Sequence, residues 1–221
     1  MKERLDEPTM ALRVAKEFKD GMIINLGYGI PTQAANFIPE SIEVIFHAEN
    51  GCLGYGPTPT RVEDEDFHLV NATGQFATPR PGMCFFDHAE SFTMIRGRHI
   101  DLCVLGAMQV SEKGDLANWT IQLGRPGNIG GAMDLAFGAH HLIAVMTHTT
   151  RNNEPKLLKQ CTYPLTAPHC ISMIVTDIAV LDVTPEGLLL KETAPGWTAE
   201  EIQALTEPEL IISKDLKTMV L

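Results

Sequence analysis

The sequence predicts an α/β fold with an open, mostly parallel sheet, flanking helices and added antiparallel strands. In the N-terminal part, short apolar runs rich in β-branched residues alternate with segments of helical periodicity. Nearer the C-terminus, strand-like runs follow one another through short turns, which is typical of antiparallel hairpins. Because 44% of the 221 residues are hydrophobic, the chain can form a substantial core. We therefore expect residues 1–221 to form a single domain.

The first helix and strand are predicted from spacing and from turn residues. Met10, Val14 and Phe18 recur at helical spacing after Thr9, a plausible N-cap, and Gly21 follows as a stop. The apolar run 22–26 then predicts a strand, which ends at the glycine-rich stretch 27–31.

The later elements follow from the same signals. Asp87 is expected to cap a helix through Ile95, and Thr198 with Glu201 predicts a capping box for the last helix. The glycines at 130 and 131 precede a further helix, and a proline-containing acidic stretch at 57–68 predicts a surface loop. Further expected elements are a helix at 32–37 and strands at 43–47, 102–105, 116–121, 142–146, 156–161, 180–183, 188–190 and 210–213.

Net charge indicates which partners to expect, and cysteine content indicates the redox setting. The formal net charge of −11 opposes binding to phosphate backbones, so we expect no nucleic-acid partner. The five cysteines include no CxxC pair, which indicates a reducing, cytoplasmic setting rather than a disulfide framework. The charged N-terminus lacks an apolar signal core, and no apolar run is long enough to span a membrane.

Glu49 is the candidate nucleophile. It follows the apolar run 44–46 and directly precedes a glycine-rich loop with Gly51, Gly54 and Gly56. A glutamate carboxylate is already ionised at neutral pH, so it needs no neighbouring base to act as a nucleophile. The glycines would let an acyl group approach the backbone closely.

Two other glycine-rich stretches lie between a strand and a helix. Gly27-Tyr28-Gly29 is compatible with a phosphate-binding loop or a tight turn, but it lacks the third glycine of a dinucleotide fingerprint. At Gly130-Gly131, free backbone N–H groups could hold a developing oxyanion. No HExxH, GxSxG or zinc-type His/Cys spacing occurs, so we predict no metal and no esterase-type serine.

The stretch Glu49-Asn50-Gly51-x-Leu53-Gly54-x-Gly56-Pro57 resembles the catalytic signature of the family I 3-oxoacid CoA-transferases, in their beta subunit. The similarity covers nearly the whole chain, from about residue 10 to 213. The further matching stretches are 25–32, 85–87, 91–97, 99–110, 114–119, 130–135 and 164–166.

This resemblance implies a NagB/RpiA-like α/β subunit that pairs with a homologous alpha subunit, in an α2β2 heterotetramer. It implies ping-pong transfer of coenzyme A through a thioester on Glu49, with Gly131 as an oxyanion donor and no permanently bound cofactor. The chain alone should then be inactive, because a second oxyanion group comes from the alpha subunit. The remaining residues expected to contact substrate or CoA are Asn50, Gly51, Gly54, Gly56, Asn71 and Gly130.

The chain also departs from the family pattern near the expected site. His47 and Ala48 replace the usual Gln-Ser, Arg98 replaces a usual glycine, and Gly74 stands where some branches have a lysine. The stretch 122–129 differs from the usual loop before Gly130. Each change could shift substrate choice.

The resemblance is strongest to acetoacetate:acetate or butyrate CoA-transferases, enzymes of short-chain fatty acid and ketone body metabolism. The alternatives are a transferase for succinate or 3-oxoadipate, an acyl-CoA hydrolase, and a sugar-phosphate-binding regulatory relative without a covalent step. Glu49 discriminates among these classes, because a protein that only binds its ligand does not need it.

Overall fold

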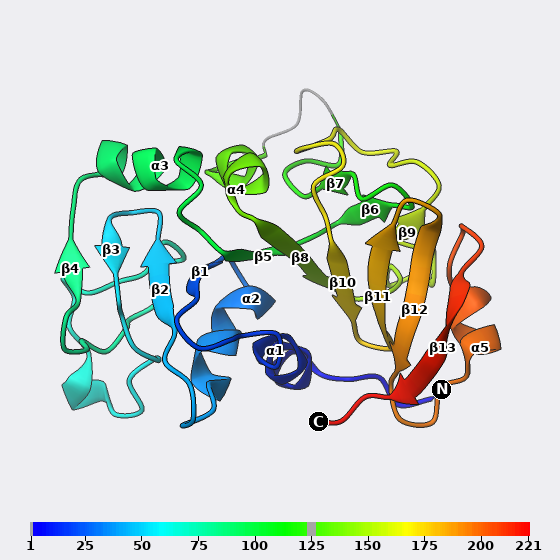
Figure 1. The fold of residues 1–221 in the computed structure, drawn as a ribbon, viewed down its shortest axis with the longest axis horizontal. Coiled ribbons are helices and arrows are strands. Elements are labelled where there is room, and N and C mark those ends of the chain that lie inside the picture. The colour runs from blue at the N-terminus through cyan, green and yellow to red at the C-terminus, as the bar shows by residue number, and fades with distance from the viewer. Residues whose placement is uncertain (1, 123–126) are drawn as a thin grey trace.

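A computed structural model describes residues 2–122 and 127–221 of the chain and shows an α/β fold built on a ten-stranded sheet (Figure 1). The strand order is β13-β12-β11-β10-β8-β5-β1-β2-β3-β4. The α-helices are α1 (Glu7–Ala15), α2 (Ile30–Gln33), α3 (His88–Arg96), α4 (Ala132–Gly138) and α5 (Ala199–Gln203), and the 3-10 helices are η1 (Ala34–Phe37) and η2 (Val62–Asp64).

The centre of the sheet is parallel, as predicted. β2 (Ile45–Ala48), β1 (Ile23–Leu26), β5 (Leu102–Gly106), β8 (His141–Met146) and β10 (Met173–Thr176) form a parallel block. Antiparallel strands extend it on both sides, namely β3 (Cys52–Leu53) and β4 (Cys84–Phe85) next to β2, and β11 (Ala179–Thr184) and β12 (Gly187–Thr193) next to β10. The edge strand β13 (Ile211–Thr218) pairs parallel with β12.

A second, three-stranded sheet lies outside the main one. It contains β6 (Gln109–Ser111), β7 (Leu116–Ala117) and β9 (Leu157–Leu158), in the order β7-β6-β9. The expected strand 116–121 is therefore much shorter than predicted, and so is the expected strand 156–161.

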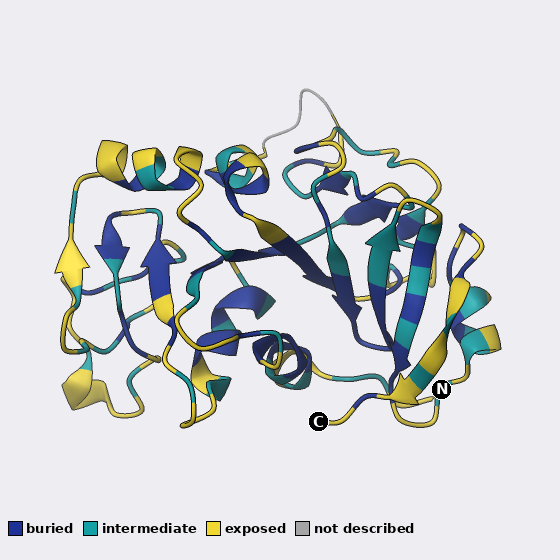
Figure 2. Cartoon of the chain, in the orientation of Figure 1, coloured by how far each residue is buried: buried dark blue, intermediate teal, exposed yellow. Residues whose placement is uncertain are grey.

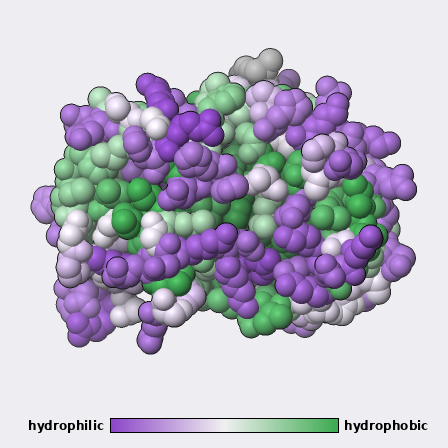
Figure 3. Space-filling view, viewed as in Figure 1, coloured by the Kyte–Doolittle hydropathy of each residue, from purple (hydrophilic) through white to green (hydrophobic). Residues whose placement is uncertain are grey.

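Helices cover both faces of the main sheet, and alternate residues of its central strands face opposite layers. Val104 packs in one buried cluster with Met10 and Val14 of α1, whereas Cys103 packs in the other with Ile95 of α3. Figure 2 shows this distribution: the central strands are buried, while the outer side of α3 and much of β13 are exposed. The face drawn in Figure 3 is mostly hydrophilic, with apolar residues visible between the polar ones.

The topology also determines where a cavity can form. β2 and β5 lie on opposite sides of β1, so the chain changes direction across the sheet at β1. In open α/β sheets, a crevice forms at such a switch point, beyond the carboxyl ends of the strands. Glu49 directly follows β2 at this edge of the sheet.

Helix starts and several strands differ from the sequence prediction. Asp6, not Thr9, caps α1, because the Asp6 carboxylate accepts the backbone N–H of Thr9 at 2.9 Å. The expected helix at 32–37 begins earlier, at Ile30, and continues as the 3-10 helix η1. Strands β3, β4, β6 and β10 were not predicted. The capping box of Thr198 and Glu201 is confirmed, and so is the cap of α3 by Asp87.

A buried histidine joins three elements near the end of β8. His148 Nδ1 lies 3.0 Å from the hydroxyl of Thr176, and its Nε2 lies 2.9 Å from the hydroxyl of Thr206. The Thr206 hydroxyl in turn donates to the carbonyl of Ile202 in α5. Burial lowers the pKa of His148 to about 4, because the charged ring would lose its hydration.

This lowered pKa predicts a loss of stability in acid. The unfolded chain takes up a proton near pH 6.5 whereas the folded chain resists it to about pH 4, so the contribution of His148 is complete above pH 6.5 and falls below it. Between pH 7.5 and 5 we expect His148 alone to account for a loss of about 2 kcal/mol in the free energy of unfolding.

Denaturant unfolding at the two pH values tests this expectation. The variant His148→Gln should lose less stability than the wild type on acidification. The control His140→Gln, at an exposed histidine, should behave as the wild type does. Equal acid losses for wild type and His148→Gln would contradict the prediction.

Candidate active site

Glu49 lies in the turn between β2 and β3, with its side chain half-buried. Burial raises its pKa above the usual value. The backbone hydrogen bond from Gly131 and the nearby His88 ring oppose that rise, while Asp134 adds to it. Glu49 is therefore a partly desolvated carboxylate with a hydrogen-bond donor beside it.

Gly131, directly before α4, faces this carboxylate so closely that a side chain would not fit. A Cβ built on Gly131 would lie 3.0 Å from Cδ of Glu49 and 2.9 Å from Cζ of Phe92, and it would overlap a carboxylate oxygen. The φ angle of Gly131 is −86°, which any residue can adopt. Glycine is therefore required here by the approach of Glu49 and not by the backbone conformation.

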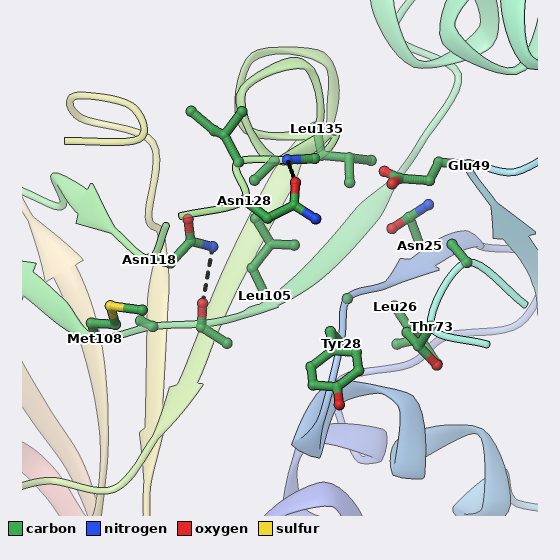
Figure 4. Close-up of a pocket in the computed structure, with 18 residues that line it drawn as sticks. Asn25, Leu26, Tyr28, Glu49, Thr73, Leu105, Met108, Asn118, Asn128 and Leu135 are labelled. Carbon is green, nitrogen blue, oxygen red and sulfur yellow. Dashed lines mark hydrogen bonds between the residues drawn. The ribbon is translucent and has the colours of Figure 1, made fainter. Parts of the chain in front are cut away.

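Glu49 and Gly131 lie at one end of a cavity of about 570 Å³. Figure 4 shows Glu49 on one side of this cavity, Asn118 and Met108 on the other, and Asn128 between them. The lining residues are Asn25, Leu26, Gly27, Tyr28, Glu49, Ala72, Thr73, Leu105, Gly106, Ala107, Met108, Asn118, Asn128, Ile129, Gly130, Gly131, Ala132 and Leu135. Among these described residues, Glu49 and the Tyr28 phenol are the ionisable side chains.

A buried hydrogen-bond network holds the strand that carries Glu49. The Asn25 amide Nδ2 donates to the His47 carbonyl at 3.1 Å and lies 3.0 Å from His47 Nδ1. Nδ1 is therefore the acceptor, the ring proton is on Nε2, and Nε2 donates to the Ser91 hydroxyl at 3.1 Å. Burial lowers the pKa of His47 to about 4, so the ring is neutral at physiological pH. The network joins β1, β2 and α3 two residues before Glu49.

Helix α3 contributes two further residues next to Glu49. His88 Nδ1 donates to the Glu49 carbonyl at 3.2 Å, and its ring packs on Phe92 with centroids 4.5 Å apart. Phe92 in turn closes the space beside Gly131. The backbone of Glu49 is thus held on the side of α3 as well as by β2.

The glycines that follow Glu49 have packing roles and do not line the cavity. Gly51 has φ 115°, and a Cβ there would overlap the carbonyl oxygen of Phe86. A Cβ at Gly54 would lie 3.4 Å from Met83 Cα, and one at Gly56 would lie 3.1 Å from the Thr78 carbonyl oxygen. These glycines allow the β3–β4 region to fold closely against the turn, whereas the sequence had suggested that they admit an acyl group.

Among the other predicted residues, Gly130 lines the cavity but Asn50 and Asn71 do not. Asn50 is exposed and donates from Nδ2 to the carbonyl of Val70 at 2.9 Å. The buried Asn71 accepts at Oδ1 from the backbone N–H and the hydroxyl of Thr73, a residue that does line the cavity. Asn71 therefore acts on the cavity only through Thr73.

The departures from the family pattern lie in different places. His47 belongs to the network beneath Glu49, whereas Arg98 is exposed after α3 with φ 62°, a conformation that favours glycine. Gly74, with φ 78°, does not line the cavity. The departing stretch 122–129 lies partly outside the described residues, because residues 123–126 are not among them.

Sequence reasoning missed the amide side chains of the cavity. Asn25, Asn118 and Asn128 all line it, although they are far apart in the chain. Asn25 belongs to β1 and Asn118 follows β7 of the second sheet, so the tertiary fold and not a local pattern brings them to the same cavity.

Residues 2–122 and 127–221 contain neither a candidate metal site nor a candidate membrane-spanning helix. No cluster of three or more His, Cys, Asp or Glu side chains there could hold a metal ion. In the same ranges, every helix is too short or too polar to cross a membrane.

Comparison with known proteins identifies the family. The family model described as coenzyme A transferase matches residues 8–205. The chain is 49% identical to the B chain of 3-oxoadipate CoA-transferase from Pseudomonas putida, over 95% of this chain and 98% of that protein. It is 44% identical to the beta chain of acetate CoA-transferase from Escherichia coli K12, with 95% of each chain covered. It is also 48% identical to human mitochondrial succinyl-CoA:3-ketoacid coenzyme A transferase 2, over 94% of this chain but 40% of that protein.

Solved structures share the fold at low sequence identity. An Escherichia coli O157:H7 acyl-CoA transferase, determined as a thioester complex with CoA, aligns with a TM-score of 0.73 at 19% identity. The alignment covers all of this chain and 44% of that one. Glutaconate coenzyme A-transferase from Acidaminococcus fermentans aligns with a TM-score of 0.72 at 16% identity, over 98% of this chain and 89% of that one. Together with the sequence matches, these findings show that the chain belongs to the coenzyme A transferase family, as a family I subunit of the beta type.

Proposed function

We propose that this chain transfers coenzyme A between a short-chain acyl-CoA and a carboxylic acid through a covalent thioester on Glu49. The single observation that carries the proposal is the half-buried Glu49 carboxylate, placed against the backbone N–H of Gly131 at one end of the cavity. A binding protein would gain nothing from a desolvated carboxylate that faces a cavity of this kind.

The first half-reaction has two steps. The Glu49 carboxylate attacks the thioester carbonyl carbon, and the collapse of the oxyanion expels the CoA thiolate and leaves an acyl-glutamyl anhydride. The thiolate then attacks the Glu49 carbonyl carbon of the anhydride, which forms a Glu49–CoA thioester and releases the first carboxylate. A second carboxylate reverses both steps and leaves as its CoA ester. Because one thioester replaces another, the exchange needs no external energy source.

Gly131 is proposed to act as a hydrogen-bond donor in each of these steps. Its N–H faces Glu49 in the resting structure. The same N–H can therefore donate a hydrogen bond to the tetrahedral oxyanion when the negative charge moves there. Burial of Glu49 also raises the reactivity of its carboxylate, since a poorly solvated anion is a stronger nucleophile. Shielding from water protects the anhydride and the thioester from hydrolysis.

The lining of the cavity favours acids with a single carboxylate. Apart from Glu49, the described lining residues carry no formal charge, and their polar groups are amides, hydroxyls and backbone groups. The second carboxylate of succinate or 3-oxoadipate would lose its hydration without a cationic partner among these residues. Acetate, butyrate and acetoacetate avoid this cost, and we propose them as the substrate class.

The proposed partner is a homologous alpha subunit, in an α2β2 assembly. Relatives named as the B or beta chain of an enzyme support this, because such names imply a second kind of chain. In the family this second chain supplies the other oxyanion donor. The beta-type chain purified alone is therefore expected to show no turnover.

The first prediction concerns Glu49 and uses the chain assembled with an alpha-type partner. Glu49→Gln should lower the rate of CoA transfer from acetoacetyl-CoA to acetate by at least about a thousandfold, because the amide is a poor nucleophile. Mass spectrometry of wild-type enzyme incubated with acetoacetyl-CoA should find CoA linked at position 49. Glu90→Gln, a change at an exposed carboxylate of α3, is the matched control.

Two results would reject the proposal. One is transfer by Glu49→Gln at the wild-type rate, and the other is an adduct on a different residue. Release of free CoA without any acceptor acid would instead identify a hydrolase.

The second prediction concerns Gly131. Gly131→Ala should reduce kcat by about 10²–10³, because the added methyl group would overlap the Glu49 carboxylate and displace it from its donor. The φ angle of −86° suits alanine, so any fall in the melting temperature would come from the overlap of the methyl group with Glu49 and Phe92 and not from backbone strain. Steady-state kinetics and thermal unfolding on the same preparation test both parts. A variant with normal kcat would show that the close approach is not needed for the reaction.

The third prediction concerns His47 as a positioning residue. His47→Leu leaves the Asn25 amide and the Ser91 hydroxyl without their buried partner, so Glu49 should lose its fixed position. We expect kcat to fall by about tenfold or more with KM nearly unchanged, whereas His47→Gln, which can both accept and donate, should recover most of kcat. Equal losses in both variants would indicate a purely steric role.

A further inference from the structure

The amide of Asn128 has a fixed orientation at the edge of the cavity. The backbone N–H of Gly130 donates to Asn128 Oδ1 at 3.0 Å. An N–H donor requires the oxygen of the amide to face it, so this bond also determines the position of the nitrogen. The Nδ2 group, with two N–H donors, therefore points away from Gly130.

Figure 4 shows Nδ2 of Asn128 directed into the cavity, on the path between Glu49 and the far end lined by Asn118 and Met108. The amide nitrogens of the other two asparagines of the lining each have an acceptor within the described residues. Asn25 Nδ2 lies at hydrogen-bond distance from two atoms of His47, and Asn118 Nδ2 donates to the carbonyl of Gly106 at 3.1 Å. Asn128 is thus the lining asparagine whose Nδ2 donates to no described residue.

Apolar side chains surround the same part of the cavity. Leu105 and Leu135 lie beside Asn128 in Figure 4, and the lining continues to Met108. A hydrocarbon acyl chain extending from Glu49 would pack on these residues. A carbonyl oxygen on such a chain would need a hydrogen-bond donor there, because its desolvation is otherwise costly.

On the basis of the proposed function, we propose that Asn128 selects acyl groups that carry a 3-oxo oxygen, by donating a hydrogen bond from Nδ2 to that oxygen. The thioester oxygen is adjacent to Glu49 and Gly131, whereas the 3-oxo oxygen lies two carbons further along the acyl chain. Asn128 stands between Glu49 and the far end of the cavity, on the side toward which the acyl chain would extend. It is a specificity-determining residue for 3-oxoacyl-CoA over saturated acyl-CoA of equal length.

Asn128→Asp separates the two roles of this side chain. The aspartate can still accept the backbone N–H of Gly130 and so keep the turn, but it offers an anionic oxygen where Nδ2 stood. Asn36→Asp is the matched control, since Oδ1 of the exposed Asn36 also accepts a backbone N–H, from Thr58, and Asn36 does not line the cavity.

The experiment measures kcat/KM of the assembled enzyme for acetoacetyl-CoA and for butyryl-CoA, with acetate as the acceptor. These acyl groups have the same number of carbons and differ in the 3-oxo oxygen. The negative charge that Asn128→Asp adds affects Glu49 with either substrate, so the ratio of the two kcat/KM values isolates the 3-oxo contact. We expect this ratio to fall about fivefold or more in Asn128→Asp and to stay at the wild-type value in Asn36→Asp.

A smaller fall in the ratio, or an equal loss with both substrates, would overturn the assignment of Asn128. Such a result would leave the proposed function intact, provided that Glu49→Gln still abolished transfer. If the wild-type enzyme transferred CoA from neither substrate, the proposed function itself would fail, and the role of Asn128 with it.

Discussion

The approach of the Glu49 carboxylate to the backbone of Gly131 is the constraint on which the site depends. A carboxylate taken partly out of water needs compensation, and here it comes from a backbone donor that a side chain would obstruct. The two residues reach each other because β2 and the start of α4 meet at the same edge of the sheet. The cavity, the lining loops and Phe92 are arranged around this pair.

The main chain around Glu49, the proposed nucleophile, is also held in place by neighbouring elements. Neutral His47 joins the strand of Glu49 to β1 and α3, and His88 contacts the Glu49 backbone from α3. Gly51 brings the following turn against Phe86. With its main chain fixed by these contacts, Glu49 would change covalent partner in the proposed mechanism through side-chain rotation alone. The acyl group and the CoA chain would then have to move past a stationary residue.

Much of the fold could be predicted from the sequence, because strand and helix periodicity report which faces are buried. The parallel centre, the C-terminal hairpin and the caps of α3 and α5 followed from local patterns. β10 was missed, and so were the short strands β3 and β4, whose existence depends on pairing between distant segments. Glu49 was proposed from the apolar run before it and the glycine loop after it, and the role proposed for Gly131 came from the resemblance to a family. The lining asparagines were not proposed, because no local pattern reports which loops meet at a switch point. The glycines at 51, 54 and 56 pack closely against neighbouring segments, and chain packing and ligand access favour the same residue type.

Glu49 directly follows β2, whereas other loops line the rest of the cavity. This separation affects how the substrate choice of such enzymes diverges. Glu49 is supported by β1, β2 and α3, whereas Thr73, Asn118 and Asn128 come from other connecting segments. Mutations in those segments can alter which acid is accepted while the chemical machinery is inherited unchanged. Relatives named for 3-oxoadipate, acetate and succinyl-CoA:3-ketoacid at 44–49% identity are what such a division of labour would produce over evolutionary time.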